Sequence, residues 1–214
     1  MYDHQSEVQE IVSRLKKDTL SYKDKHILIT GGAGFLGSWI CEALIAQGAR
    51  VVCLDNLSSG KFSNIQHLRN HSNFRFIQHD ISWPIYFGKT IPNAVSYPNI
   101  TEPFDYVFHF ASRASPFEFR TYAINIMKSN TLGTMNSLGI VKEHRATMFY
   151  ASTSECYGNP PPEMVPTPET YWGHVNPIGP RSCYDESKRA GEAFCKAYEL
   201  QHNVNIHIVR IFNT

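Results

Sequence analysis

Short apolar runs alternate with amphipathic segments along most of the chain. Six runs rich in β-branched and aromatic residues recur at 26–30, 50–55, 73–78, 105–111, 146–152 and 205–212. Apolar residues at helical spacing fill 36–47, 124–142 and 182–202 between them. Strands that alternate with helices are typical of a parallel sheet covered on both faces, so the pattern predicts a doubly wound α/β domain over 25–214.

Three other segments complete this organisation. Val8, Ile11, Val12 and Leu15 follow helical spacing, which predicts an amphipathic helix within residues 1–24, packed outside the main domain. Two proline-rich stretches, 82–103 and 158–181, are expected to be long irregular loops. Both follow the carboxyl end of a predicted strand, where open α/β sheets bind their ligands.

Composition narrows the classes of function. Twenty basic and nineteen acidic residues leave a net charge of +1, so no bulk field favours nucleic acid or a membrane surface. Five cysteines without a C-x-x-C pair predict buried reduced thiols, and no apolar run reaches the roughly 18 residues of a membrane helix. We therefore expect a cytoplasmic, metal-free protein without nucleic-acid or membrane partners.

A glycine motif directly follows the first predicted strand. Gly31, Gly34 and Gly37 in "TGGAGFLG" stand between strand and helix, where a tight turn lets backbone N–H groups approach a pyrophosphate. Asp55 ends the next strand, where a carboxylate can accept hydrogen bonds from both ribose hydroxyls of an unphosphorylated adenosine. The pattern predicts an NAD site and favours NAD over NADP, although a glycine-rich turn without a ligand is the alternative.

Further cofactor contacts are predicted around this motif. Asp80 and Ile81, after the third strand, occupy a place where an adenine can be held, although Asp80 can equally cap a loop. The predicted cofactor contacts also include the neighbouring residues Phe35, Leu36, Asn56 and Ala111.

A candidate chemical site lies at the same sheet edge. Thr153 ends the fifth strand, and Tyr184 and Lys188 share one face of the next helix at i, i+4 spacing. The lysine, beside the cofactor ribose, can lower the pKa of the phenol and make it a base, while Thr153 shares a hydrogen bond with the same substrate oxygen. Each motif alone could be a chance pairing or a capping hydroxyl, but their shared edge favours a catalytic site.

Together, "TGGAGFLG", "STSECYG" and "YDESK" resemble the extended short-chain dehydrogenase/reductases of the nucleotide-sugar epimerase/dehydratase superfamily. The segments "YWGHVNPIGPRSCYDESKR", at 171–189, and "RIFNT", at 210–214, most resemble the UDP-glucuronate decarboxylases, also called UDP-xylose synthases. The resemblance implies a Rossmann-type fold whose carboxyl-terminal substrate lobe is largely missing from this chain. We therefore expect poor stability and little turnover from these residues alone.

The resemblance further implies NAD-dependent decarboxylation of UDP-glucuronate to UDP-xylose. Tyr184, with Thr153 and Lys188, would take the proton from the sugar O4 while C4 gives its hydride to NAD. The resulting 4-keto acid loses carbon dioxide, and the returning hydride makes the reaction redox-neutral. Glu155 and Ser154 match residues that assist loss of the carboxylate and protonation at C5. A nucleotide-sugar 4-epimerase, a 4,6-dehydratase and a non-catalytic NAD-binding protein are the alternatives.

Substrate and subunit contacts are also implied by the resemblance. The sugar-nucleotide contacts would be Ile85, Tyr86, Ser112, Lys128, Asn136, Tyr198 and Gln201, and Phe110 and Thr214 would contact the cofactor. Lys128 could instead be a solvated helix lysine, and Tyr86 a packing anchor. A homodimer would form through four helices, two from each subunit, within 121–142 and 182–202. The chain departs from the family pattern around the sugar, at Arg113, Phe119, Glu143 and Cys156 and in an insertion around 87–102.

Overall fold

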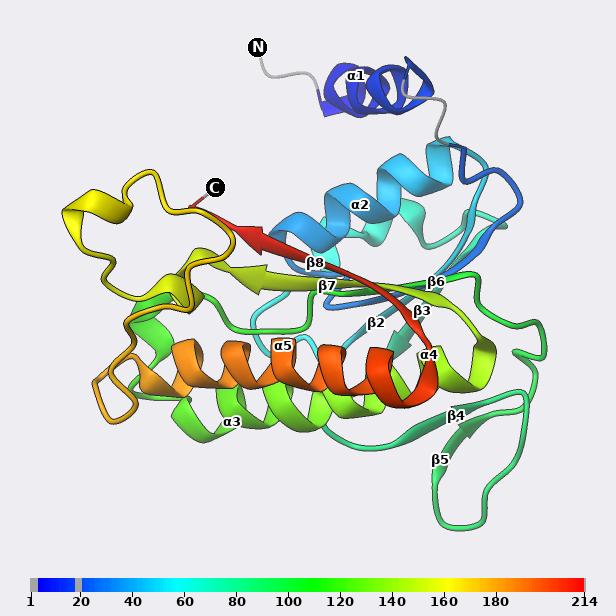
Figure 1. Ribbon diagram of the computed structural model, residues 1–214. Coiled ribbons are helices and arrows are strands. Elements are labelled where there is room, and N and C mark those ends of the chain that lie inside the picture. Colours follow the sequence, from blue (N-terminus) through cyan, green and yellow to red (C-terminus); the bar gives the residue numbers. More distant parts are fainter. Residues whose placement is uncertain (1–3, 18–20, 214) are drawn as a thin grey trace.

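The computed structural model describes residues 4–17 and 21–213 and contains one large parallel sheet. Its strand order is β3-β2-β1-β6-β7-β8 (Figure 1). The strands are β1 (His26–Thr30), β2 (Arg50–Asp55), β3 (Phe74–Gln78), β6 (Tyr106–His109), β7 (Thr147–Thr153) and β8 (Asn205–Ile211). Each lies within about two residues of a predicted run, so the predicted doubly wound fold is confirmed.

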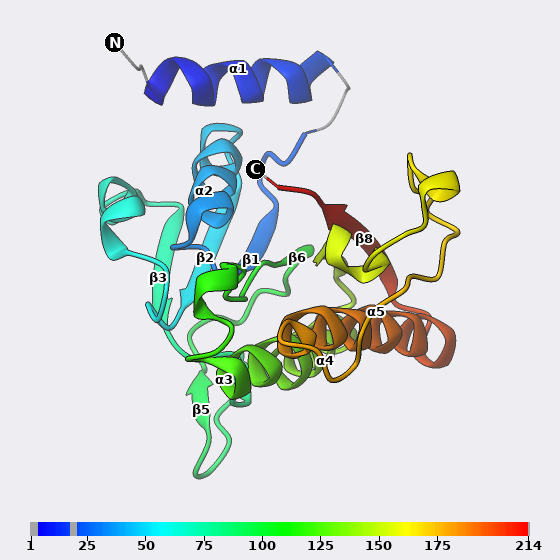
Figure 2. The same cartoon turned by 90° about the vertical axis from the view of Figure 1, so that its left-hand side faces the viewer.

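Helices cover both faces of this sheet. Helix α2 (Phe35–Ala46) lies on one face, and α3 (Ala123–Lys128), α4 (Thr134–His144) and α5 (Ser182–His202) lie on the other (Figures 1 and 2). In β1, Ile27 and Ile29 belong to the core under α2, whereas Leu28 belongs to the core under α4 and α5. Since β1 pairs with β2 on one side and β6 on the other, the crevice of the fold opens at the carboxyl end of β1.

The helix predicted over 124–142 is divided by a π-helical segment, Ser129–Gly133. The hydroxyl of Thr131 donates to the carbonyl of Met127 at 2.6 Å, and that of Thr134 to the carbonyl of Asn130 at 2.7 Å. Such side-chain bonds compete with the α-helical ladder, and a π turn accommodates one extra residue. The segment also brings Gly133 against Ile81, because a β-carbon there would lie 3.0 Å from the Ile81 side chain.

The prediction that residues 82–103 lack regular structure is wrong. Two short strands, β4 (Ile85–Phe87) and β5 (Val95–Tyr97), pair in parallel as a separate sheet. The prolines lie outside both strands, so they do not interrupt the hydrogen bonds between them. Ile85 and Phe87 are buried against the core near Phe104. The segment 82–103 therefore runs away from the carboxyl edge of the main sheet and covers the core beside α4 (Figure 1).

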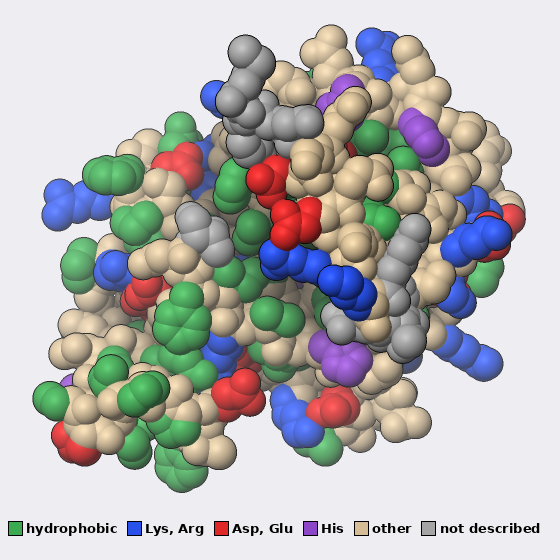
Figure 3. All heavy atoms as spheres, turned by 90° about the horizontal axis from the view of Figure 1, so that it is seen from above, with side chains coloured by type: hydrophobic (Ala, Val, Ile, Leu, Met, Phe, Trp, Pro, Cys, Tyr) green, Lys and Arg blue, Asp and Glu red, His purple; other side chains and the backbone are tan. Residues whose placement is uncertain are grey.

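Residues 158–181 are irregular, as predicted, apart from a bridge between Gly158 and His174 and one 3₁₀ turn. Among the described residues, the 3₁₀ helices are Phe62–Asn64, Gln66–Leu68, Pro116–Glu118, Ser154–Tyr157 and Pro162–Met164. Trp172 and Ile178 in this loop are about nine-tenths exposed. Figure 3 shows apolar side chains gathered on the side where Figure 1 places the loop. This edge of the molecule therefore presents an apolar surface.

Helix α1 (His4–Lys17) lies over α2, outside the two main cores (Figure 2). Val8 and Val12 of α1 are buried, whereas Ile11 and Leu15 are half-buried. Within 4–17 and 21–213, we find no helix that is long and apolar enough to cross a membrane.

Candidate active site

The glycine motif forms the turn between β1 and α2. Gly31 has φ +74°, and a β-carbon there would lie 2.6 Å from the backbone nitrogen of Ala111. A β-carbon on Gly37 would lie 2.2 Å from the carbonyl oxygen of Gly31. The turn therefore requires glycine at both positions, and it brings the start of α2 close to β1. Backbone N–H groups at a helix start arranged in this way bind phosphate groups.

Asp55 ends β2 beside this turn. Its carboxylate accepts hydrogen bonds from the backbone N–H of Ala33 at 3.0 Å and of Leu57 at 2.7 Å. Burial raises the pKa of Asp55, and these two hydrogen bonds oppose that rise. Each carboxylate oxygen can accept more than one hydrogen bond, so Asp55 can still receive the hydroxyls of a ribose.

An open cavity of about 250 Å³ lies between the glycine turn and the ends of β2, β3 and β6. Its lining includes all the predicted cofactor contacts up to residue 111: Gly31, Gly34, Phe35, Leu36, Gly37, Asp55, Asn56, Asp80, Ile81, Phe110 and Ala111. The predicted contact Thr214 lies outside the described residues. A glycine turn and a strand-end carboxylate that line one cavity fit a dinucleotide such as NAD.

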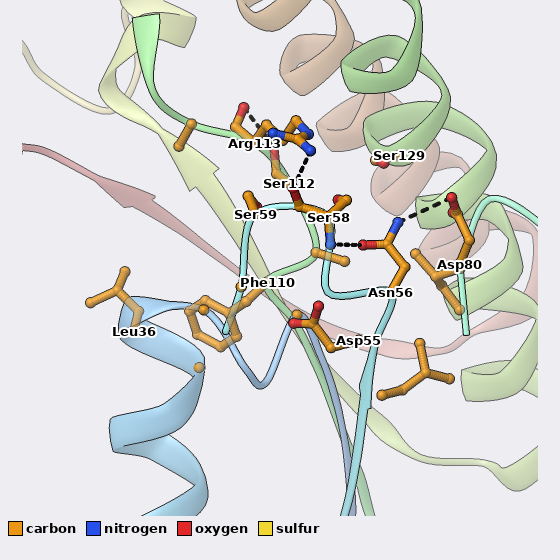
Figure 4. Close-up of a pocket in the computed structure, with 18 of the residues that line it drawn as sticks. Leu36, Asp55, Asn56, Ser58, Ser59, Asp80, Phe110, Ser112, Arg113 and Ser129 are labelled. Atoms are coloured by element: carbon orange, nitrogen blue, oxygen red, sulfur yellow. Dashed lines mark hydrogen bonds between the residues drawn. The ribbon is translucent and has the colours of Figure 1, made fainter. Parts of the chain in front are cut away.

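Sequence reasoning missed one wall of this cavity, formed by residues 58–60 and Arg113. The backbone N–H of Ser58 donates to the side-chain oxygen of Asn56, and Arg113 donates to the Ser58 carbonyl (Figure 4). Arg113 also pairs with Glu118 and lies 4.0 Å from the centre of the Tyr122 ring. The Ser-Ser-Gly run shortly after Asp55 was the available signal for this wall.

Asp80 lines the cavity and also caps its own loop. Its carboxylate accepts a hydrogen bond from the Asn56 amide at 3.1 Å (Figure 4). It also accepts hydrogen bonds from the backbone N–H and the hydroxyl of Ser82 at 2.9 and 2.7 Å. Burial raises the pKa of Asp80, but these hydrogen bonds prevail and hold it below its ordinary value. The loop-cap interpretation therefore describes the contacts that Asp80 makes, and an adenine contact stays a prediction.

The second cavity, also of about 250 Å³, contains the predicted chemical groups. Thr153, Tyr184 and Lys188 all line it, and each is at most 6% exposed. Tyr184 forms a hydrogen bond with Thr153 and stacks on Phe119, with ring centres 5.0 Å apart. Leu36, Phe110, Ser112 and Ala114 line both cavities, so the chemical groups and the dinucleotide cavity adjoin.

The pKa of Tyr184 is raised in this arrangement, contrary to the prediction that it falls toward neutral pH. Burial raises the pKa of Tyr184 above its ordinary value, although the hydrogen bond with Thr153 opposes the rise. The Lys188 ammonium donates to the Ala151 carbonyl at 2.6 Å and lies 5.9 Å from the centre of the Tyr184 ring. Burial also lowers the pKa of Lys188 to about 8, so the lysine is mainly charged at neutral pH.

Glu155 lines the same cavity and forms an ion pair with Arg181 at 2.7 Å. Sequence reasoning missed this arginine because the two residues are far apart in the sequence. Glu155 lies in the turn after β7, and Arg181 directly precedes α5. Ser154 is half-buried at the start of a 3₁₀ turn and is not among the described residues that line either cavity. Its predicted role stays a prediction.

The predicted substrate contacts do not lie together within one chain. Ser112 lines both cavities, Lys128 is exposed at the end of α3, and the Asn136 amide donates to the Ile81 carbonyl at 2.8 Å. Ile85 and Tyr86 lie on β4, and the Lys89 ammonium lies 5.4 Å from the centre of the Tyr86 ring. Tyr198 and Gln201 lie about 21 and 26 Å along α5 from Tyr184. A sugar ring at Tyr184 therefore does not reach these two residues, and their predicted contact with the nucleotide stays a prediction.

Within the described ranges, no group of three or more His, Cys, Asp or Glu side chains is arranged to hold a metal ion.

The chain matches the model of the NAD dependent epimerase/dehydratase family over residues 27–214. It is 45% identical over 196 residues to UDP-glucuronic acid decarboxylase 1 of Xenopus tropicalis, covering 91% of this chain and 42% of the relative. It is 40% identical over 195 residues to UDP-glucuronic acid decarboxylase 4 of Arabidopsis thaliana, covering 91% of this chain and 40% of the relative. The chain thus spans less than half the length of these curated relatives.

Solved structures share the fold. UDP-N-acetylglucosamine 4-epimerase from Methanobrevibacter ruminantium, in complex with UDP-N-acetylmuramic acid, has a TM-score of 0.70 and 28% identity, over 88% of this chain and 55% of that one. UDP-glucose 4-epimerase of Thermus thermophilus, in complex with NAD, has a TM-score of 0.64 and 27% identity, over 86% of this chain and 54% of that one.

Proposed function

Because the chain belongs to the NAD dependent epimerase/dehydratase family, we propose that its full-length protein converts UDP-glucuronate to UDP-xylose through a 4-keto intermediate. The observation that carries this proposal is the single cavity lined by Thr153, Glu155, Tyr184 and Lys188 beside the glycine turn. The names of the relatives at 40–45% identity favour decarboxylation among the reactions that such a cavity supports.

NAD is the proposed cofactor. The glycine turn of Gly31 and Gly37 would receive its pyrophosphate, and Asp55 its adenosine ribose. When bound, NAD supplies a reversible hydride acceptor, which leaves the overall reaction redox-neutral. The side of the cavity that holds Tyr184 and Lys188 would then face the reacting sugar.

Tyr184 is the proposed base for the sugar O4 proton. Burial raises the pKa of its phenol, so the phenolate that would take the O4 proton needs a positive charge beside it. The hydroxyl of Thr153, which bonds to the phenol, would share the same oxygen. Lys188 contributes a nearby positive charge at neutral pH, which favours the anionic phenol during transfer.

Glu155 is the proposed acid–base group for loss of the carboxylate and for protonation at C5. Its ion pair with Arg181 keeps a carboxylate at the cavity wall, on the same side as Thr153. A β-keto acid loses carbon dioxide readily because its electrons pass to the ketone, so the protein has only to position the sugar and return a proton.

Two other reactions begin with the same oxidation at C4. Epimerisation and 4,6-dehydration would also use Tyr184, Lys188 and Thr153, and solved 4-epimerases share the fold at 27–28% identity. A third possibility is an NAD-binding protein without catalysis. Mass analysis of the products distinguishes these alternatives from decarboxylation.

The test is incubation of the full-length protein with NAD and UDP-glucuronate, followed by mass spectrometry. A product lighter by carbon dioxide supports decarboxylation, an isomer of unchanged mass supports epimerisation, and no product with any UDP-sugar supports the non-catalytic alternative. Tyr184→Phe should abolish turnover and spare NAD binding. Tyr97→Phe, on β5 and outside the lining of both cavities, is the matched control and should keep full activity.

A homodimer through four helices is proposed as well. Ile124, Met127, Leu132 and Met135 follow helical spacing along α3, the π segment and α4, and all are 41–64% exposed. Such an apolar stripe favours burial against a second copy.

The five cysteines are buried free thiols, which supports a reducing compartment such as the cytoplasm.

A further inference from the structure

The ammonium of Lys188 lies between two tyrosine rings. Its nitrogen is 5.3 Å from the centre of the Tyr150 ring and 5.9 Å from that of Tyr184. Lys188 is 4% exposed, and its nitrogen donates a hydrogen bond to the Ala151 carbonyl. The faces of aromatic rings attract cations within about 6 Å, most strongly where water is excluded. Tyr150 therefore belongs to the immediate surroundings of the buried charge.

Gly191 makes room for Tyr150. The phenol of Tyr150 donates to the Lys188 carbonyl at 3.3 Å, so strand β7 is tied to α5 at this point. A β-carbon on Gly191 would lie 1.9 Å from the Tyr150 hydroxyl oxygen and 2.6 Å from the adjacent ring carbon. Glycine is a poor residue for a helix interior, and here no other residue leaves space for the ring.

The other groups near the ammonium come from four elements. They are Tyr184, Glu192 and Cys195 on α5, Cys156 after β7, Tyr150 on β7 and His109 on β6. Burial, aided by the charge of Lys188, lowers the pKa of His109 to about 3, so this ring is neutral. Glu192 is engaged by Ser152 at 2.5 Å and by Arg210 at 2.7 Å. The uncharged ring of Tyr150 thus stabilises the buried ammonium by direct contact.

We propose that Tyr150 is a positioning residue for Lys188, one that holds the ammonium toward Tyr184 and favours its charged form. This inference rests on the proposed roles of Tyr184 and Lys188. Without the ring, the ammonium loses a favourable contact while its burial is unchanged. Lys188 then releases its proton at lower pH, and its position relative to Tyr184 is less well defined.

The test is a direct titration of Lys188 by NMR, in full-length protein labelled with ¹³C at lysine Cε. The Lys188 signal is assigned by its loss in Lys188→Arg. Tyr150→Phe keeps the ring face and should leave the pKa of Lys188 unchanged. Tyr150→Leu removes the ring and should lower that pKa by about 0.5–1 unit, the equivalent of a modest cation–π interaction. In an active enzyme, the alkaline loss of turnover should begin earlier by the same amount.

Two further variants keep the result decisive. Tyr150→Met replaces the ring with a flexible chain and serves if Tyr150→Leu does not fold, as judged by circular dichroism. Gly191→Ala should displace the ring and shift the Lys188 signal in the wild-type background, but not in the Y150L background. A wild-type titration of Lys188 in folded Y150L, or in Y150M if Y150L does not fold, overturns the proposal. Since the titration needs no turnover, this result is distinct from failure of the proposed reaction.

Discussion

The guanidinium of Arg181 lies 2.7 Å from the carboxylate of Glu155 and 3.9 Å from that of Asp185. One cation therefore links the residue before α5 to the turn that follows β7. Arg181 also lines the cavity that contains Tyr184, so this link forms part of the wall of the candidate site.

Replacing Arg181 should weaken catalysis without unfolding the protein. Arg181→Gln removes the charge that orients Glu155, and we expect turnover of UDP-glucuronate to fall about tenfold, since the pair is partly exposed. Steady-state kinetics of the full-length protein measures the effect. Lys196→Gln, which breaks an exposed pair with Glu199 on the same helix, is the control and should have no effect. Equal turnover in both variants would contradict the role of the link.

Asp185 should make stability depend on pH. Burial raises its pKa to about 6, and one carboxylate oxygen is buried without a hydrogen-bond partner. The folded form thus binds the proton more tightly than the unfolded form, whose pKa is about 3.9. The free energy of unfolding therefore falls as pH rises from about 4 to about 6, and the loss is complete above that range.

Asp185→Asn should accordingly stabilise the protein at pH 7 by about 1–2 kcal/mol and have little effect near pH 4. Urea denaturation at the two pH values measures the difference. Glu199→Gln removes an exposed carboxylate from the same helix and should show no such gain. A gain of equal size at both pH values would rule out titration of Asp185 as its cause.

Two glycines should respond to alanine in opposite ways. Gly37→Ala places a β-carbon 2.2 Å from the Gly31 carbonyl oxygen, so we expect NAD affinity to fall at least about tenfold as the turn is displaced. Gly139, inside α4, has no atom within 4 Å of such a carbon. Gly139→Ala should raise the free energy of unfolding by about 0.5–1 kcal/mol. Calorimetric NAD titration tests Gly37→Ala, and urea denaturation tests Gly139→Ala. An unchanged NAD affinity in Gly37→Ala would contradict the assignment of this turn to the cofactor.

Disruption of the apolar helix stripe should change the oligomeric state. Leu132 is 46% exposed at its centre, and Leu132→Glu should shift a homodimer toward monomers in sedimentation velocity. Trp83→Glu changes a residue that is 66% exposed outside α3–α5 and should leave the distribution unchanged. A dimer that survives Leu132→Glu would place the interface elsewhere.

The sequence allowed the main sheet to be predicted because its strands are continuous apolar runs bounded by polar residues, as at 26–30 and 50–55. The cofactor cavity could be located because Gly31 directly follows β1 and Asp55 ends β2. The strands β4 and β5 were missed because they are only three residues long and lie among prolines. Local patterns also do not reveal the Arg181–Glu155 pair or the burial that raises the pKa of Tyr184, since both depend on contacts between distant segments.

The π segment at Ser129–Gly133 affects how changes in chain length should be interpreted. A π turn holds one residue more than an α turn, so loss of one residue here could restore a regular turn and leave both flanking helices in register. Ser129 lines the cofactor cavity, whereas α4 packs on the core. In an alignment with homologues, a one-residue gap at this place would therefore mark a reshaped cavity wall within an unchanged fold.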